Sequence, residues 1–129
     1  MDRVEVLRDV YREWARGNYR AGLELFDPDV TLEIHSPIPE AGAYEGKTGL
    51  RRYMSGFLGT WQDYEIRGTD FEEEGDTVLV QVHHGGRASG VWVEADFVTG
   101  WTFDGDRVVR LDTAQDREAA LAGARASGA

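Results

Sequence analysis

Residues 26–53 decide the fold, and their sequence is FDPDVTLEIHSPIPEAGAYEGKTGLRRY. Apolar and polar residues alternate over Val30–His35, which predicts a strand with one apolar face. The segment Ser36–Pro39 cannot continue a central strand or a helix, because proline lacks a backbone N–H donor. A helix is predicted after Gly46 by apolar residues that recur every three or four positions, namely Leu50, Tyr53, Met54, Phe57 and Trp61.

The chain on either side of this stretch has two different periods. Before it, helical spacing of apolar residues predicts one helix that ends at Gly17 and a second, short helix over Tyr19–Phe26. After it, the period becomes two, and Gly100 is expected to mark a bend or bulge in the longest strand. The predicted strands cover residues around 64–71, 78–84, 91–103 and 107–113, and a last helix covers 115–124.

Length, charge and composition limit the kind of protein. The 129 residues fit a single domain over 1–125, followed by a frayed tail over 126–129. The net charge of −10 disfavours nucleic acid and anionic membranes as partners. The charged N-terminus has no secretory signal, and no run approaches the ~18 apolar residues of a membrane span, so a cytoplasmic protein is expected. The absence of cysteine excludes disulfides and thiolate chemistry.

Early helices followed by antiparallel strands predict the α+β class. The expected architecture is a cone-shaped α+β barrel, in which a strongly bent, mixed or antiparallel sheet wraps over the N-terminal helices. Four stretches carry a family likeness: EWARGNYRAGLELFDPDV, PEAGAYEGKTGLRRY, GWTFDGDRVVRL and DREAAL. They resemble the nuclear transport factor 2-like (ketosteroid isomerase-like) superfamily, and within it the SnoaL-like group. That superfamily includes isomerases, hydrolases, polyketide cyclases, dehydratases and non-catalytic binding domains, so the fold does not select an activity.

The resemblance can be followed position by position for ketosteroid isomerases. Their catalytic tyrosine and two aspartates correspond here to Val10, Ile34 and Thr99, none of which can do that acid–base work. Tyr11 lies one residue from the tyrosine position, and a one-residue step on a helix is expected to turn it ~100° away from the pocket. The sequence therefore argues against ketosteroid isomerase chemistry.

Two other activities of the superfamily give different candidates. The Asp-Arg-Asp network of its epoxide hydrolases has Asp96, Arg110 and Asp112 as the nearest match, but strand parity places all three on the outer face of the sheet. Polyketide-cyclase relatives place an acid or a histidine in the cavity, and His84 fits best because it shares a face with three valines. His83 should point the other way, so no metal site is expected.

Several aromatic residues are concentrated where the cone should be hollow, and they either line a pocket or fill the core. With a pocket, we expect a small apolar ligand and a cofactor-independent cyclase, isomerase or lyase, with His84 and Thr99 as the polar candidates. The predicted ligand-binding residues are Val10, Tyr11, Trp14, Ile34, Tyr53, Phe57, Val82, Phe97, Trp101, Leu111 and Thr113. No cofactor is predicted.

The alternative is a non-catalytic, dimeric binding or accessory module. Leu79, Trp92 and Val98 fall on the predicted outer face of the sheet, where an exposed apolar patch would favour a homodimer. On the first strand, Glu33 and His35 share one face, either as a charge pair or as part of a solvated outer surface.

Overall fold

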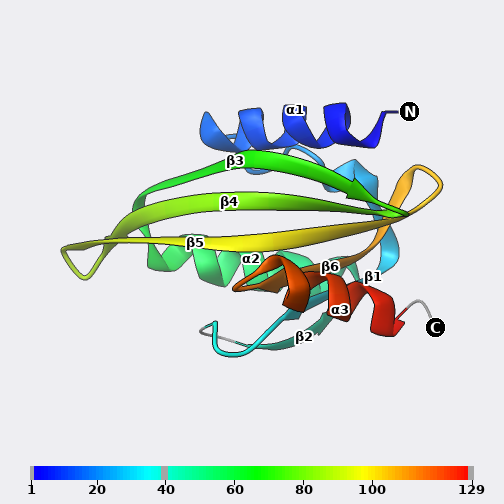
Figure 1. The fold of residues 1–129 in the computed structure, drawn as a ribbon. Coiled ribbons are helices and arrows are strands. Elements are labelled where there is room, and N and C mark those ends of the chain that lie inside the picture. The colour runs from blue at the N-terminus through cyan, green and yellow to red at the C-terminus, as the bar shows by residue number, and fades with distance from the viewer. Residues whose placement is uncertain (1, 39–40, 128–129) are drawn as a thin grey trace.

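The computed structural model describes residues 2–38 and 41–127. The described residues form three α-helices, one short 3-10 helix and a six-stranded sheet (Figure 1). In chain order the elements are α1 (Arg3–Ala15), η1 (Leu23–Leu25), β1 (Phe26–Ile34), β2 (Gly42–Glu45), α2 (Gly46–Thr60), β3 (Gln62–Glu74), β4 (Thr77–Ala88), β5 (Val91–Asp104), β6 (Arg107–Ala114) and α3 (Arg117–Ser127). The predicted α+β class is confirmed.

The sheet is mixed and open, with the strand order β2-β1-β6-β5-β4-β3. β1 runs parallel to β6, and every other neighbouring pair is antiparallel. The long strands β3, β4 and β5 lie side by side over most of their length (Figure 1). Because β1 pairs with β6, the sheet brings together segments from the first and last thirds of the sequence.

Helices cover both faces of the sheet. On the inner face, α1 packs on β3 and α2 packs on β1 and β2. On the outer face, α3 packs on β4, β5 and β6. The large core lies on the inner face, and its largest fully buried apolar side chains are Trp101, Phe26, Leu7, Val30, Val78, Val80, Val82 and Val108.

The second core lies under α3 and changes the expectation for the outer face. Leu79 and Val98 are each only 3 % exposed, because they pack against Ala120 and Leu121 of α3. The predicted exposed patch is therefore wrong for these two residues, whereas Trp92 remains 38 % exposed. Strand parity placed Leu79 and Val98 on the correct face of the sheet, but it could not show that a helix covers this face.

Two local predictions are also corrected, and one strand was missed. The expected helix over Tyr19–Phe26 is only the turn η1, since Gly22 has a φ of +88° and the chain is already extended at Phe26. The short strand β2 was not predicted. Gly100 pairs regularly with its neighbours, and the irregularity in β5 falls between Thr102 and Phe103 instead.

The last helix is longer than predicted. Asp116 caps it, with its carboxylate accepting a hydrogen bond from the backbone N–H of Ala119 at 2.9 Å. The helix continues to Ser127, so the first two residues of the predicted tail over 126–129 are helical, and 128–129 lie outside the described residues. Within the described part of the chain, every helix is too short or too polar to cross a membrane.

Candidate functional site

Five half-buried rings gather at one end of the inner face, where α2 ends and β3 begins. They are Phe57, Trp61, Tyr64, His84 and Phe97, and we call them the aromatic mouth. α2 and the residue after it supply the first two rings, and β3, β4 and β5 supply one each. Three adjacent strands and one helix end therefore place a histidine among aromatic side chains.

His84 is held from several sides in the aromatic mouth. The Phe57 ring lies nearly parallel to the imidazole, with 6.0 Å between ring centroids and 7° between planes. Phe97 meets it edge-on at 4.7 Å. The Tyr64 hydroxyl lies 2.9 Å from Nδ1 of His84, within hydrogen-bond distance. The ring orientation of His84 is therefore fixed by stacking and by one polar contact.

Burial controls the protonation of this pair. It lowers the pKa of His84 below its ordinary value, and the charge of neighbouring His83 adds to the effect. Burial also raises the pKa of the Tyr64 hydroxyl. At neutral pH the two groups are thus both uncharged and share one hydrogen bond.

His83 lies on the other face of the same strand, and its pKa is shifted in the opposite direction to that of His84. Its Nδ1 lies 2.6 Å from Asp96 and its Nε2 lies 3.1 Å from Glu94. Hydrogen bonds to these two carboxylates raise the pKa of His83. The two adjacent histidines therefore point to opposite faces, as predicted from strand geometry.

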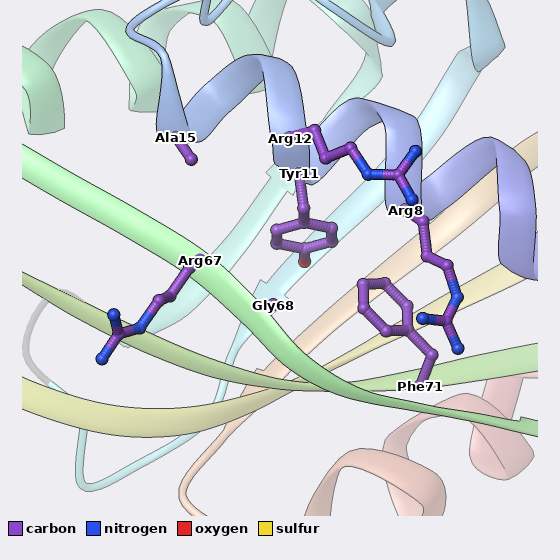
Figure 2. Close-up of a pocket in the computed structure, with 7 residues that line it drawn as sticks. All are labelled: Arg8, Tyr11, Arg12, Ala15, Arg67, Gly68 and Phe71. Atoms are coloured by element: carbon purple, nitrogen blue, oxygen red, sulfur yellow. The ribbon is translucent and has the colours of Figure 1, made fainter.

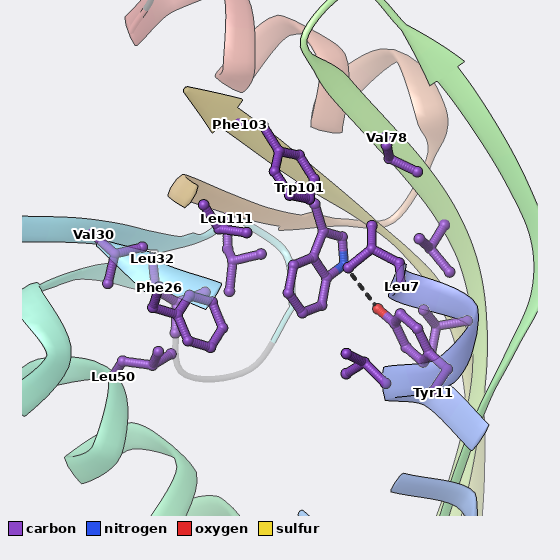
Figure 3. Close-up of a cluster of buried hydrophobic side chains, with 14 of the residues drawn as sticks. Leu7, Tyr11, Phe26, Val30, Leu32, Leu50, Val78, Trp101, Phe103 and Leu111 are labelled. Carbon is purple, nitrogen blue, oxygen red and sulfur yellow. Dashed lines mark hydrogen bonds between the residues drawn. The ribbon is translucent and has the colours of Figure 1, made fainter. Parts of the chain in front are cut away.

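In the large core on the inner face, Tyr11 and Trp101 form a buried polar contact (Figure 3). The indole Nε1–H donates to the Tyr11 hydroxyl at 3.0 Å, and Tyr11 is 3 % exposed. Burial raises the pKa of Tyr11, although hydrogen bonds with Trp101 and Thr99 oppose the shift. A proton-transfer role for Tyr11 is thus disfavoured at neutral pH.

This position of Tyr11 corrects the expectation that it turns away from the pocket. α1 is buried over a wide arc, because the segment before β1 covers it on one side and the sheet covers it on another. Val10 faces the segment before β1, since a β-carbon at Gly22 would lie 3.0 Å from the Val10 side chain. Tyr11 faces Trp101 on the sheet. Both neighbours on the helix are therefore interior residues.

A protein family matches most of the chain. The family model of the SnoaL-like domain matches residues 7–111. The chain belongs to the SnoaL-like domain family. No curated protein matches its sequence.

Solved structures with this fold cover nearly the whole chain. A protein of Xanthomonas campestris with a cystatin-like fold has a TM-score of 0.77 and 17 % identity, covering 94 % of this chain and 98 % of its own. A protein of Jannaschia sp. CCS1 named a SnoaL-like polyketide cyclase has a TM-score of 0.73 and 22 % identity, with coverage of 95 % and 88 %. TerC, co-crystallised with polyporic acid, has a TM-score of 0.74 and 19 % identity, with coverage of 95 % of each chain. These likenesses confirm the predicted fold.

In this SnoaL-like domain, the predicted lining divides into two groups. One group packs as core and is at most 6 % exposed, and it contains Val10, Tyr11, Ile34, Val82, Trp101, Leu111 and the polar candidate Thr99. The other group is half-buried, and it contains Trp14, Tyr53, Phe57, Phe97 and Thr113. Thr99 Oγ1 lies 3.3 Å from Thr113 Oγ1, whereas His84 has Tyr64 as its polar partner, so the two polar candidates have different partners.

Trp61 and Tyr64 belong to the mouth of this SnoaL-like domain but were not among the predicted site residues. A signal for each is present in the sequence. Trp61 follows Phe57 by four residues, and Tyr64 shares strand parity with Ile66, which packs against the core. Gly86 lets Trp61 lie close to the sheet, because a β-carbon there would come 2.7 Å from the indole.

The outer face of the SnoaL-like domain carries an ion-pair network. Arg110 donates to both oxygens of Asp112, at 2.9 and 2.8 Å, and to Glu33 at 2.7 Å. His35 Nε2 lies 2.9 Å from Asp112, whose side chain is completely buried. Asp96 pairs with His83 instead, so the hydrolase-like set is not assembled. The parity prediction that these groups face outward is confirmed.

The network contains donor atoms suited to a metal ion. Single ligand atoms of Glu33, His35 and Asp112 lie within 4.8 Å of one another. The Arg110 guanidinium already binds both Asp112 oxygens and one of Glu33, so a cation would have to displace it. We therefore interpret the cluster as a structural network that links the side chains of β1 and β6 on the outer face of the sheet.

Proposed function

We propose that this SnoaL-like domain binds a flat, mostly apolar small molecule at the aromatic mouth. The observation that carries the proposal is the His84 ring, which is stacked on Phe57, met by Phe97 and hydrogen-bonded to Tyr64. Half-buried rings offer faces and edges on which a planar ligand can stack. A few fixed polar groups among apolar walls are typical of small-molecule sites.

The same pair supports a proton-transfer reaction that needs no cofactor. With Nδ1 of His84 engaged by Tyr64, Nε2 is the imidazole atom left for a ligand. If Nδ1–H donates to the Tyr64 oxygen, Nε2 is a base, and in the other tautomer Nε2–H is a donor. Moving a proton at an acidic carbon or an enol is the step that cyclases, isomerases and lyases of this kind share. The similar Jannaschia protein, named a SnoaL-like polyketide cyclase, supports this class.

Binding of a planar probe such as 2-naphthol tests the site. Trp61→Ala is expected to weaken binding by about tenfold, because losing a stacking partner removes about 1.4 kcal/mol. Trp92→Ala is the matched control, since it removes the same side chain from outside the mouth and should leave the affinity unchanged. The affinity is measured by titration calorimetry, and an equal loss in both variants would contradict the proposed site.

His84→Phe separates stacking from chemistry in the same protein. The substituted ring keeps the contacts with Phe57 and Phe97 but has no nitrogen for proton transfer. Binding of the probe should persist, whereas turnover of any enolisable polycyclic substrate found by screening should be lost. Full turnover in His84→Phe would show that the histidine is not the base or acid.

A homodimeric, non-catalytic module remains the second candidate function. Its support is the tip of the β4–β5 hairpin, where Val91, Trp92 and Val93 are 62 %, 38 % and 43 % exposed. We expect light scattering at micromolar concentration to give twice the monomer mass of 14.4 kDa, and Trp92→Asp to restore the monomer. A mass of 14.4 kDa for the unmodified chain would remove this candidate.

A further inference from the structure

A pocket lies between α1 and the edge strand β3 (Figure 2). Its volume is about 180 Å³. α1 contributes Arg8, Tyr11 and Arg12, and β3 contributes Arg67, Gly68 and Phe71. None of the aromatic-mouth residues lines it.

The charge of this pocket is opposite to that of the chain. The protein has 24 acidic and 14 basic residues, yet three arginines and no acidic residue line the pocket. Arg67 has no ion-pair partner among the described residues. Arg8 and Arg12 pair with Glu5 and Asp9 on their own helix, but these pairs are exposed and therefore weak. None of the three guanidinium groups is thus held in a strong ion pair, and Figure 2 shows them pointing in different directions around the pocket, with that of Arg8 beside Phe71.

The wall of the pocket is aromatic. The Arg8 guanidinium lies 4.9 Å from the centroid of the Phe71 ring, which also meets the Tyr11 ring edge-on at 5.8 Å. Gly68 allows this close packing, because a β-carbon there would lie 2.8 Å from Phe71 and 3.2 Å from Tyr11. The Tyr11 hydroxyl is already bonded to Trp101, so the polar recognition must come from the arginines.

From this combination we infer that the pocket binds a small planar carboxylate whose conjugated body packs on Phe71. Guanidinium groups bind carboxylates through paired N–H donors, and they also stack on aromatic faces. The volume is below the range of drug-sized sites, which suits one ring rather than a polycycle. The inference does not depend on the proposed function, because it uses other residues and another ligand charge.

Benzoate is the probe for this site, and benzamide is its uncharged counterpart of the same shape. Benzoate is expected to bind at least about tenfold more tightly, because only the carboxylate forms charge-assisted hydrogen bonds. Backbone amide shifts in NMR spectra should be largest at Gly68 and Phe71. Equal affinity for the two compounds, or shifts centred on His84, would overturn the inference.

Arginine substitutions test which cations take part. Arg67→Gln and Arg8→Gln should each weaken benzoate binding by about fivefold or more, whereas Arg16→Gln should not. Arg16 is the matched control, since it follows the last residue of α1, pairs with Glu13 and does not line the pocket. Binding of 2-naphthol at the mouth should be unchanged in Arg67→Gln, which separates failure of one site from failure of the other. Equal losses in all three variants, or displacement of benzoate by inorganic phosphate at equal concentration, would overturn a carboxylate-specific site.

Discussion

Replacing Trp101 by alanine is expected to lower the free energy of unfolding by about 3–5 kcal/mol. Trp101 is 1 % exposed, and its ring stacks on Phe26 at 5.8 Å and meets Tyr11 edge-on at 5.9 Å. The substitution would remove these contacts and also the N–H that donates to the Tyr11 hydroxyl. Because domains of this size are stable by only about 5–15 kcal/mol, one change would remove a large part of the total. Urea denaturation followed by circular dichroism measures the effect.

The control for this experiment is Trp92→Ala, which deletes the same side chain from a site that is 38 % exposed. Its effect should be smaller, because the Trp92 side chain is more than a third exposed and lies outside the buried core that surrounds Trp101. Trp101→Phe adds a second comparison, since it keeps much of the apolar volume and removes the hydrogen bond to Tyr11. If Trp101→Ala and Trp92→Ala destabilise the chain equally, the inner core is not organised around Trp101.

Much of the fold could be predicted because the local patterns agree with the tertiary structure. The alternation in Val30–His35 and the three-and-four spacing after Gly46 correspond to β1 and α2. The pairing of β1 with β6, which joins Thr31 to Arg110, could not be predicted, since no local pattern encodes so distant a partner. The short strand β2 was missed because four residues, Gly42–Glu45, are too few to show an alternating pattern. The helix expected near Tyr19 failed because Gly22 takes a left-handed conformation.

The site was predicted less completely for a related reason. Strand parity gave the correct faces for His83, His84 and Asp112, because the period of a strand is local. The burial of a side chain depends on tertiary contacts and not on the local sequence pattern. The sequence therefore could not distinguish Trp101, which fills the core, from Phe97, which lies at the mouth. The same reason explains Tyr11, whose inward position depends on two surfaces that enclose α1.

Replacing Asp112 by asparagine is expected to destabilise the protein by about 3 kcal/mol. Asp112 is fully buried and holds Arg110 through two hydrogen bonds and His35 through a third contact. Asparagine keeps the size of the side chain but removes the charge, which leaves a largely buried guanidinium with only Glu33 as its acidic partner. Gly123 of α3 packs directly against the network, so hydrogen exchange in α3 should also increase.

The matched control is Glu72→Gln, because Glu72 also binds an arginine through two hydrogen bonds, with Arg117 at 2.8 and 2.9 Å. That pair is exposed, so the same loss of a carboxylate should hardly change the stability. The double variant Asp112→Asn, Arg110→Met should regain part of the loss, since the unpaired charge is then removed as well. Chemical denaturation of the three variants measures these changes in the free energy of unfolding. If Asp112→Asn is as mild as Glu72→Gln, the buried network contributes little to the stability, and the packing of Leu79 and Val98 must hold α3 on the sheet.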